Sequence, residues 1–334
     1  MFDLYVVIFF LWTAIALYLL LGGADFGVGI AELFSNKKNQ EQIHKIMYRE
    51  MGPVWEANHM WLIIVIVILF VGFPQIYSTL STYLHIPLLI MLLGIIARGT
   101  AFTFRHYDAV IDNWHKVYNK IFIYSSFITP FFLGIIAAAT VSGTINTEAT
   151  EFSTAYIWSW LTPFGIALGV FTSCICGYLA CSYTISQIEN EEEKKYIGKK
   201  VKIFLISVIL SGGLVFACAG YQNLPLIRWI YGGVVGWAAV LFATLSAIGA
   251  FYCIYKNKYS AIRILAGFQV IMILLAVTYG HYPDLVLLKQ GSLSLLSGEN
   301  EPKTIKMLAW ALILGSIFIL PGVFHLIYSF QKKR

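Results

Sequence analysis

The chain opens with MFDLYVVIFFLWTAIALYLLLGGADFGVGI (Met1 to Ile30), and this stretch decides the fold class. From Leu4 onward it carries a single charged side chain, Asp25. A helix needs ~20 apolar residues to cross the hydrocarbon core of a bilayer, and this segment is long enough. No basic region precedes it, and it is too long for a cleaved signal peptide, so we expect a retained first membrane helix.

The composition of the whole chain agrees with this interpretation. Hydrophobic residues make up 59% of the 334 residues and charged residues 12%, with a mean hydropathy of +0.75. Soluble domains carry about 25% charged residues, so the composition excludes that class. The net charge of +6 does not indicate nucleic-acid binding, because the basic residues lie in short loops beside apolar segments.

Nine apolar segments predict an all-α, polytopic membrane protein with nine transmembrane helices and short polar connectors. The predicted spans are Leu4 to Ile30, Val54 to Phe73, Tyr83 to Phe104, Val117 to Thr140, Leu161 to Tyr183, Ile203 to Gly220, Trp229 to Tyr255, Ala261 to Tyr279, and Leu308 to Phe330. The charged run Glu189 to Lys202 is expected to extend the sixth helix beyond the membrane. The outer segment from Gly280 to Lys306 is expected to be an irregular loop.

The distribution of basic residues predicts the orientation. With the N-terminus outside, 18 of the 23 Lys and Arg residues fall on the cytoplasmic side, four fall outside, and Arg98 lies within a span. Basic residues gather in cytoplasmic loops, so we predict an external N-terminus and a cytoplasmic C-terminus.

Three charged residues are expected at similar depths in the cytoplasmic halves of consecutive helices: Asp25, Glu56 and Arg98. A charge inside a spanning helix costs ~2.5–3.5 kcal/mol on insertion scales, so such residues are usually paired or line an ion or proton route. For Asp25 and Arg98, a structural ion pair and a proton-path role are both open. Glu56 and His59 share one helix face near the aqueous boundary, which favours a proton relay.

Two other residue types indicate little chemistry. The seven histidines fall in loops or near helix ends, and no pair of them is placed to hold a haem between helices. The five cysteines fall inside predicted spans, where small apolar packing is favoured over a metal cluster of Cys174, Cys176 and Cys181. We therefore assign no catalytic, cofactor-binding or metal-ligating residue to this chain.

Five strings resemble subunit II of the cytochrome bd-type ubiquinol oxidases. The first two are highly specific, and together the five cover nearly the whole length. They are GGADFGVG (Gly22 to Gly29), GPVWEANHMWLI (Gly52 to Ile63), IIARGTAFTFR (Ile95 to Arg105), LTPFGIALGV (Leu161 to Val170) and TYGHYPDLV (Thr278 to Val286).

This resemblance implies an architecture of two four-helix bundles followed by a peripheral ninth helix. As one membrane domain of residues 1–334, the chain would comprise a first bundle at 1–140, a second at 161–279, an extracytoplasmic loop at 280–307 and the ninth helix at 308–330. It also implies a heterodimer with subunit I in the bacterial cytoplasmic membrane. Subunit I would hold two haems b and one haem d and would oxidise quinol, and this chain would be inactive alone. A structural quinone and small single-helix accessory subunits are left open.

The resemblance also implies roles for single residues. Trp61 would border an oxygen route from the membrane, and Glu56, with Asp25 and His59, would belong to a proton route from the cytoplasm. Glu56 replaces an aspartate found in some members, His59 a glutamine, and His281 the usual glutamine of its segment. The alternatives are a proton-coupled secondary transporter, which also carries midmembrane carboxylates, and a purely structural assembly factor.

Overall fold

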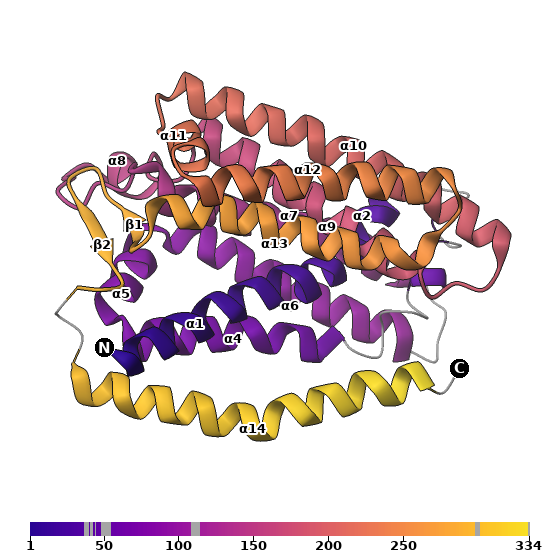
Figure 1. Cartoon of the computed structure of the whole chain (residues 1–334), viewed down its shortest axis with the longest axis horizontal. Helices are drawn as coiled ribbons and strands as arrows, with labels where there is room; N and C mark the ends of the chain where they lie inside the picture. The colour runs from indigo at the N-terminus through magenta and orange to yellow at the C-terminus, as the bar shows by residue number, and fades with distance from the viewer. Residues whose placement is uncertain are drawn as a thin grey trace.

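The computed structural model describes residues 1–36, 40, 43, 45–47, 55–107, 114–297 and 301–332. The side chains of residues 55, 56, 106, 107, 115, 320, 323, 324 and 326–332 fall outside that description. Within these limits the molecule is helical, apart from one small two-stranded sheet (Figure 1).

The first membrane helix is one rod made of two halves. Helix α1 (Phe2–Leu17) passes through a single π-helical turn (Tyr18–Gly22) into α2 (Gly23–Leu33). The predicted span from Leu4 to Ile30 lies inside this rod, but no residue pattern indicated the π-helical turn. Such turns insert one extra residue and often occur at functional sites.

The other helices follow the order of the predicted spans. They are α4 (Trp55–Gly72), α5 (Pro74–Tyr83), α6 (His85–Tyr107), α7 (Trp114–Ser142), α8 (Phe152–Tyr156), α9 (Pro163–Ile185), α10 (Glu191–Tyr221), α11 (Leu226–Tyr231), α12 (Val234–Tyr255), α13 (Ile262–His281) and α14 (Pro302–Lys332).

Eight helices in the described part of the chain are long and apolar enough to cross a membrane. The pair α4 and α5, bent by 115°, passes the same test together and brings the total to nine. The bend falls at Phe73 because Pro74 begins a new helix at its first position, where the missing N–H costs nothing. Up to nine spans therefore agree with the prediction. The predicted orientation of the termini stays a prediction.

The predicted start of the seventh span was wrong. The seventh span was expected to begin at Trp229, but the chain makes the short helix α11 there, and α12 begins only at Val234. The two adjacent glycines, Gly232 and Gly233, interrupt the helix because glycine has the least helical preference of any residue except proline. Helix α10 begins at Glu191 and so includes most of the charged run that was predicted to extend the sixth helix; Asn190 caps its start by accepting from two backbone N–H groups.

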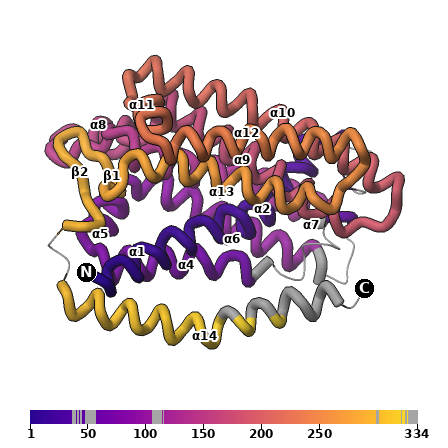
Figure 2. Tube along the Cα trace, viewed as in Figure 1, coloured from indigo at the N-terminus to yellow at the C-terminus, as the bar shows by residue number. Residues whose placement is uncertain are grey.

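The segment after α13 was expected to be an irregular loop, but part of it is a β-hairpin. Strands β1 (Asp284–Leu287) and β2 (Ser292–Ser294) form an antiparallel hairpin, which Figure 2 shows at one end of the molecule. Gly291, at φ +102°, lies in the connecting turn, a conformation that favours glycine. The backbone N–H of Lys289 also donates to the carbonyl of Ile145, tying the hairpin to the end of α7.

Helix α9 is the central element and α14 the most peripheral. Of the 18 consecutive residues that are most apolar in each helix, 72% are buried in α9 and 17% in α14. Helix α9 packs against α2, α7 and α10, while α14 lies along one edge of the molecule beside α1 and α4 (Figure 1). Assignment of the other helices to two separate four-helix bundles stays a prediction.

Candidate functional site

Helix α2 is held close to α9 and α7 by glycines. A Cβ atom on Gly27 would overlap the carbonyl oxygen of Cys176 in α9, and one on Gly29 would overlap the side chain of Ser126 in α7. Glycine therefore lets three backbones meet where larger residues would separate them. This close packing buries the α2 side chains, including its carboxylates, inside protein and away from lipid.

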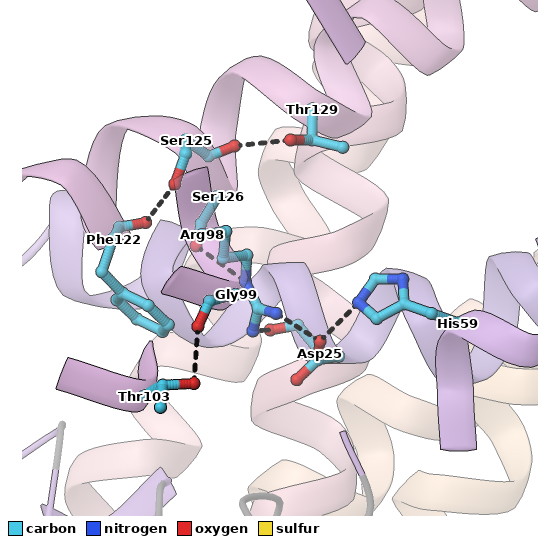
Figure 3. Close-up of polar contacts among 9 residues, drawn as sticks. All are labelled: Asp25, His59, Arg98, Gly99, Thr103, Phe122, Ser125, Ser126 and Thr129. Carbon is cyan, nitrogen blue, oxygen red and sulfur yellow. Dashed lines mark hydrogen bonds and ion pairs between the residues drawn. The ribbon is translucent and has the colours of Figure 1, made fainter. Parts of the chain in front are cut away.

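Asp25 and Arg98 form a buried ion pair between α2 and α6. The Nη1 atom of Arg98 lies 2.6 Å from Oδ2 of Asp25, and the two residues are 1% and 2% exposed (Figure 3). Arg98 also donates through Nη2 to the backbone carbonyl of Asp25 at 2.9 Å, and through Nε to Oγ of Ser126 at 3.1 Å. All three guanidinium nitrogens are therefore engaged, which is the condition under which a buried charge is tolerated.

His59 approaches the same carboxylate from α4. Its Nε2 atom lies 3.4 Å from Oδ2 of Asp25, and the other ring nitrogen points away from that carboxylate (Figure 3). The imidazole also contacts the ring of Phe26 edge-on, with centroids 5.3 Å apart. One carboxylate thus faces a permanent cation on one side and the imidazole of His59 on the other.

Two aromatic rings complete the surroundings of Arg98. The guanidinium carbon lies 5.2 Å from the ring centre of Phe26 and 5.1 Å from that of Phe122. Both rings are almost wholly buried. A desolvated cation over an aromatic face is stabilised by the ring quadrupole, so these rings help to hold Arg98 in place.

A second ion pair joins the same two helices seven residues further along each of them. Glu32 in α2 and Arg105 in α6 lie 3.1 Å apart, and Arg105 also lies over Phe122 at 5.2 Å. Glu32 is fully buried. Sequence reasoning missed this pair because it ended the first span at Ile30 and counted Arg105 as a loop residue. The available signal was the spacing, because both residues follow Asp25 and Arg98 by seven positions.

Trp61 lies on the apolar side of α4. It is 7% exposed and belongs to an apolar cluster with Ala14, Tyr18 and Phe26. One turn earlier, Asn58 is also buried, at 6% exposure. Trp61 is therefore enclosed by this chain's own side chains.

Glu56 stands in the first turn of α4, which begins at Trp55. Its side chain lies outside the described residues. The structure consequently brings together Asp25, Arg98 and His59 among the predicted site residues, and it gives no geometry for Glu56.

The cysteines and other metal-ligating residues form no metal site in the described part of the chain. No group of three His, Cys, Asp or Glu side chains there could hold a metal ion. Cys176 and Cys181 are fully buried in α9, where they pack in the main apolar cluster, and Cys174 is partly buried beside them. Packing therefore explains the described positions of these three residues.

The described histidines do not form an evident haem site. His59 is engaged with Asp25, and His85 lies at the start of α6, where Nδ1 contacts the carbonyl of Thr82. His281 ends α13, with its Nδ1 atom 2.6 Å from the carbonyl of Asp284. Haem ligation within a helical bundle requires His or Met side chains aimed into the core, and these contacts do not supply such an arrangement.

Comparisons with known proteins identify the family. The family model described as cytochrome bd terminal oxidase subunit II matches residues 4–330. Cytochrome bd ubiquinol oxidase subunit 2 of Bacillus subtilis is 28% identical over 64% of this chain and 63% of its own length. The match therefore covers less than two thirds of that relative. Putative cytochrome bd menaquinol oxidase subunit II of the same organism is 24% identical over 99% of this chain and 96% of its own.

A solved structure has the same fold. It is that of the bd oxidase from Geobacillus thermodenitrificans, which aligns over the full length of both chains with a TM-score of 0.80 at 18% identity. The family match covers almost every residue, including the strings that carry Asp25, His59 and Arg98. The chain belongs to the cytochrome bd terminal oxidase subunit II family.

Proposed function

We propose that this chain is the subunit of a quinol oxidase complex that supports the oxygen-reducing partner and does not carry the haems itself. The observation that carries this proposal is the family match over residues 4–330. Relatives are named as ubiquinol and menaquinol oxidase subunits, so the substrate class is a quinol and its ring type stays open. The relatives named above include no transporter, and the transporter alternative has no support from them.

The partner in this proposal is subunit I, which would hold two haems b and one haem d. Those haems would carry electrons from quinol to oxygen. This chain would pack against that subunit and would have no oxidase activity alone. The complex would lie in the bacterial cytoplasmic membrane, with the N-terminus of this chain outside and its C-terminus inside. Proton uptake from inside and quinol proton release outside would build a membrane potential without a pump.

We further propose that the centre at Asp25 belongs to a proton route from the cytoplasm. Asp25 and Arg98 would form its fixed part, because two hydrogen bonds and one ion pair hold the guanidinium of Arg98. His59 would be the exchanging part, because imidazole changes its charge near physiological pH. Glu56 precedes His59 by three positions on α4 and would supply protons from the aqueous side.

An oxygen route beside Trp61 is the other part of the proposal. Oxygen is small and apolar and concentrates in the membrane, so a dry passage suits it. The apolar surroundings of Trp61 fit such a passage, because Trp61 packs in one cluster with Ala14, Tyr18 and Phe26. The two routes would then occupy different sides of α4.

The test of this function is expression with and without the partner. We expect the complex to bind haem and to oxidise quinol, and this chain alone to do neither. Stoichiometric haem on the isolated chain would contradict the proposal. Within the complex, Glu56→Gln should slow oxygen consumption without displacing haem, because glutamine keeps the shape and cannot exchange the proton. Unchanged turnover across pH would remove Glu56 from the route.

A further inference from the structure

Tyr18 is the buried polar residue that the proposed routes have not used. It is 4% exposed, and its hydroxyl has no hydrogen-bond partner among the described residues. Buried hydroxyls in native structures are nearly always paired with protein or with an ordered water molecule. An exception beside a polar centre therefore points to a partner that is not a side chain.

The π-helical turn gives Tyr18 its position. Tyr18 begins the turn and Gly22 ends it, one turn further along the helix. A Cβ atom on Gly22 would lie 2.8 Å from Cε2 of Tyr18, so a larger residue would displace the ring. The glycine and the extra residue of the turn together leave room for the phenol against the bundle interior.

The ionisable groups around Tyr18 come from four neighbouring helical segments. The ring of His59 in α4 lies 6.1 Å away, centroid to centroid, with the planes inclined by 56°. Asp25 in α2, Arg98 in α6 and Cys176 in α9 are the other ionisable groups near the phenol. The phenol thus lies next to the same groups that form the Asp25 centre.

The Tyr18 and His59 rings are neighbours, but no direct hydrogen bond joins the Tyr18 hydroxyl to His59. A water molecule can link polar groups that make no direct hydrogen bond. Such a water requires two to four polar partners, and Tyr18, His59 and Asp25 are the polar groups beside the two rings.

We propose that Tyr18 is a positioning residue of the proton route, whose hydroxyl holds the water molecule that exchanges protons with His59. The imidazole gains or loses one proton, and the water delivers or accepts it. The phenol keeps its own proton, donating one hydrogen bond or accepting one. This inference rests on the proposed proton route and adds to it a residue that neither the motifs nor the ion pairs indicated.

The test is Tyr18→Phe in the whole complex, which removes the hydroxyl and keeps the ring. We expect turnover at saturating quinol and oxygen to fall about threefold to tenfold, less than the 10²–10⁴-fold loss of a direct proton-transfer group. The pH dependence of turnover should shift, while haem content and the apparent Michaelis constant for oxygen stay unchanged. A purely packing role would leave the pH profile where it is.

The matched control is Tyr178→Phe. Tyr178 in α9 is also a buried tyrosine, but its hydroxyl lies beside Ser182 in its own helix and away from the Asp25 centre. We expect no change in turnover or pH profile. Equal effects of the two substitutions would overturn the inference.

The remaining outcomes separate this inference from the proposed route. If His59→Gln alters the pH profile and Tyr18→Phe does not, the role of Tyr18 is wrong and the route stands. If neither alters it, the route itself is wrong. If the Tyr18→Phe complex does not accumulate, Gly22→Ala displaces the ring while keeping the hydroxyl, and an unchanged pH profile there would overturn the inference.

Discussion

The two halves of the first membrane helix differ in what they bury and in which helices they face. In α1 the buried residues are four apolar side chains, and the helix faces α4 and α14. In α2 ten of the eleven residues are buried, among them Asp25 and Glu32, and the helix faces α7 and α9. The π-helical turn separates the two halves.

The difference shows what drives burial inside a membrane. Lipid tails are as apolar as leucine, so an apolar helix gains little by leaving them. Small residues allow close contact, and charges require it, because an ionised side chain facing lipid is costly. The half with glycines and carboxylates is therefore central, and the apolar half is peripheral.

The largest expected effect comes from Asp25→Asn, which leaves Arg98 buried without its counter-charge. Breaking a buried pair in this way costs ~3–5 kcal/mol. We expect a lower yield of haem-loaded complex with little change in turnover per haem. The control in the other half is Asp3→Asn, at the start of α1, where we expect no measurable change. Normal assembly with lost turnover would instead make Asp25 an exchanging group of the proton route rather than its fixed part.

Gly27→Ala tests the close approach itself. The added methyl would meet the backbone of Cys176, which cannot rotate away as a side chain can. Overpacking of this kind costs about 1–3 kcal/mol, and contact with backbone favours the upper end. Thermal unfolding of the purified complex measures the loss. Gly213→Ala, where an added Cβ has no atom within 4 Å, is the matched control and should leave the midpoint unchanged.

Glu32→Gln compares the second ion pair with the first. The side chain of Arg105 is 10% exposed, compared with 2% for Arg98, so water can partly compensate the unpaired cation. We expect a loss of about 2 kcal/mol in the free energy of unfolding, smaller than for Asp25→Asn. The exposed pair Glu191 and Lys194 provides the control, because Glu191→Gln should have no measurable effect. Equal losses for Glu32 and Asp25 would remove the distinction between the two pairs.

Hydropathy and depth predicted much of this molecule. The spans followed from length, because the bilayer fixes how many apolar residues a helix needs. Asp25 and Arg98 were expected at similar depths on consecutive helices, and the structure places them in contact. The depth of a residue along a membrane helix can be estimated from the sequence, because each residue advances the helix by ~1.5 Å.

The features that were missed depend on how helices rotate and bend relative to one another. Whether Glu32 meets Arg105 depends on which sides of α2 and α6 are turned toward each other, and hydropathy does not give this rotation. The π-helical turn runs from Tyr18 to Gly22, where a Cβ atom would meet the Tyr18 ring. The hairpin after α13 depends on pairing with distant Ile145. These are tertiary properties, and single-helix patterns contain little information about them.

The smallest expected effect belongs to Ser126, which supports Arg98 from α7. Its hydroxyl accepts a hydrogen bond from Nε of Arg98, and its Cβ packs against Gly29. Ser126→Ala keeps the Cβ and removes one of the contacts of Arg98, so we expect a loss of about 1 kcal/mol in unfolding free energy. Ser125→Ala is the neighbouring control, because that hydroxyl donates only to carbonyls of its own helix and should matter less. If both substitutions lower the unfolding midpoint equally, the Ser126 hydroxyl does not contribute specifically to Arg98, and the guanidinium depends on Asp25 and the two aromatic rings alone.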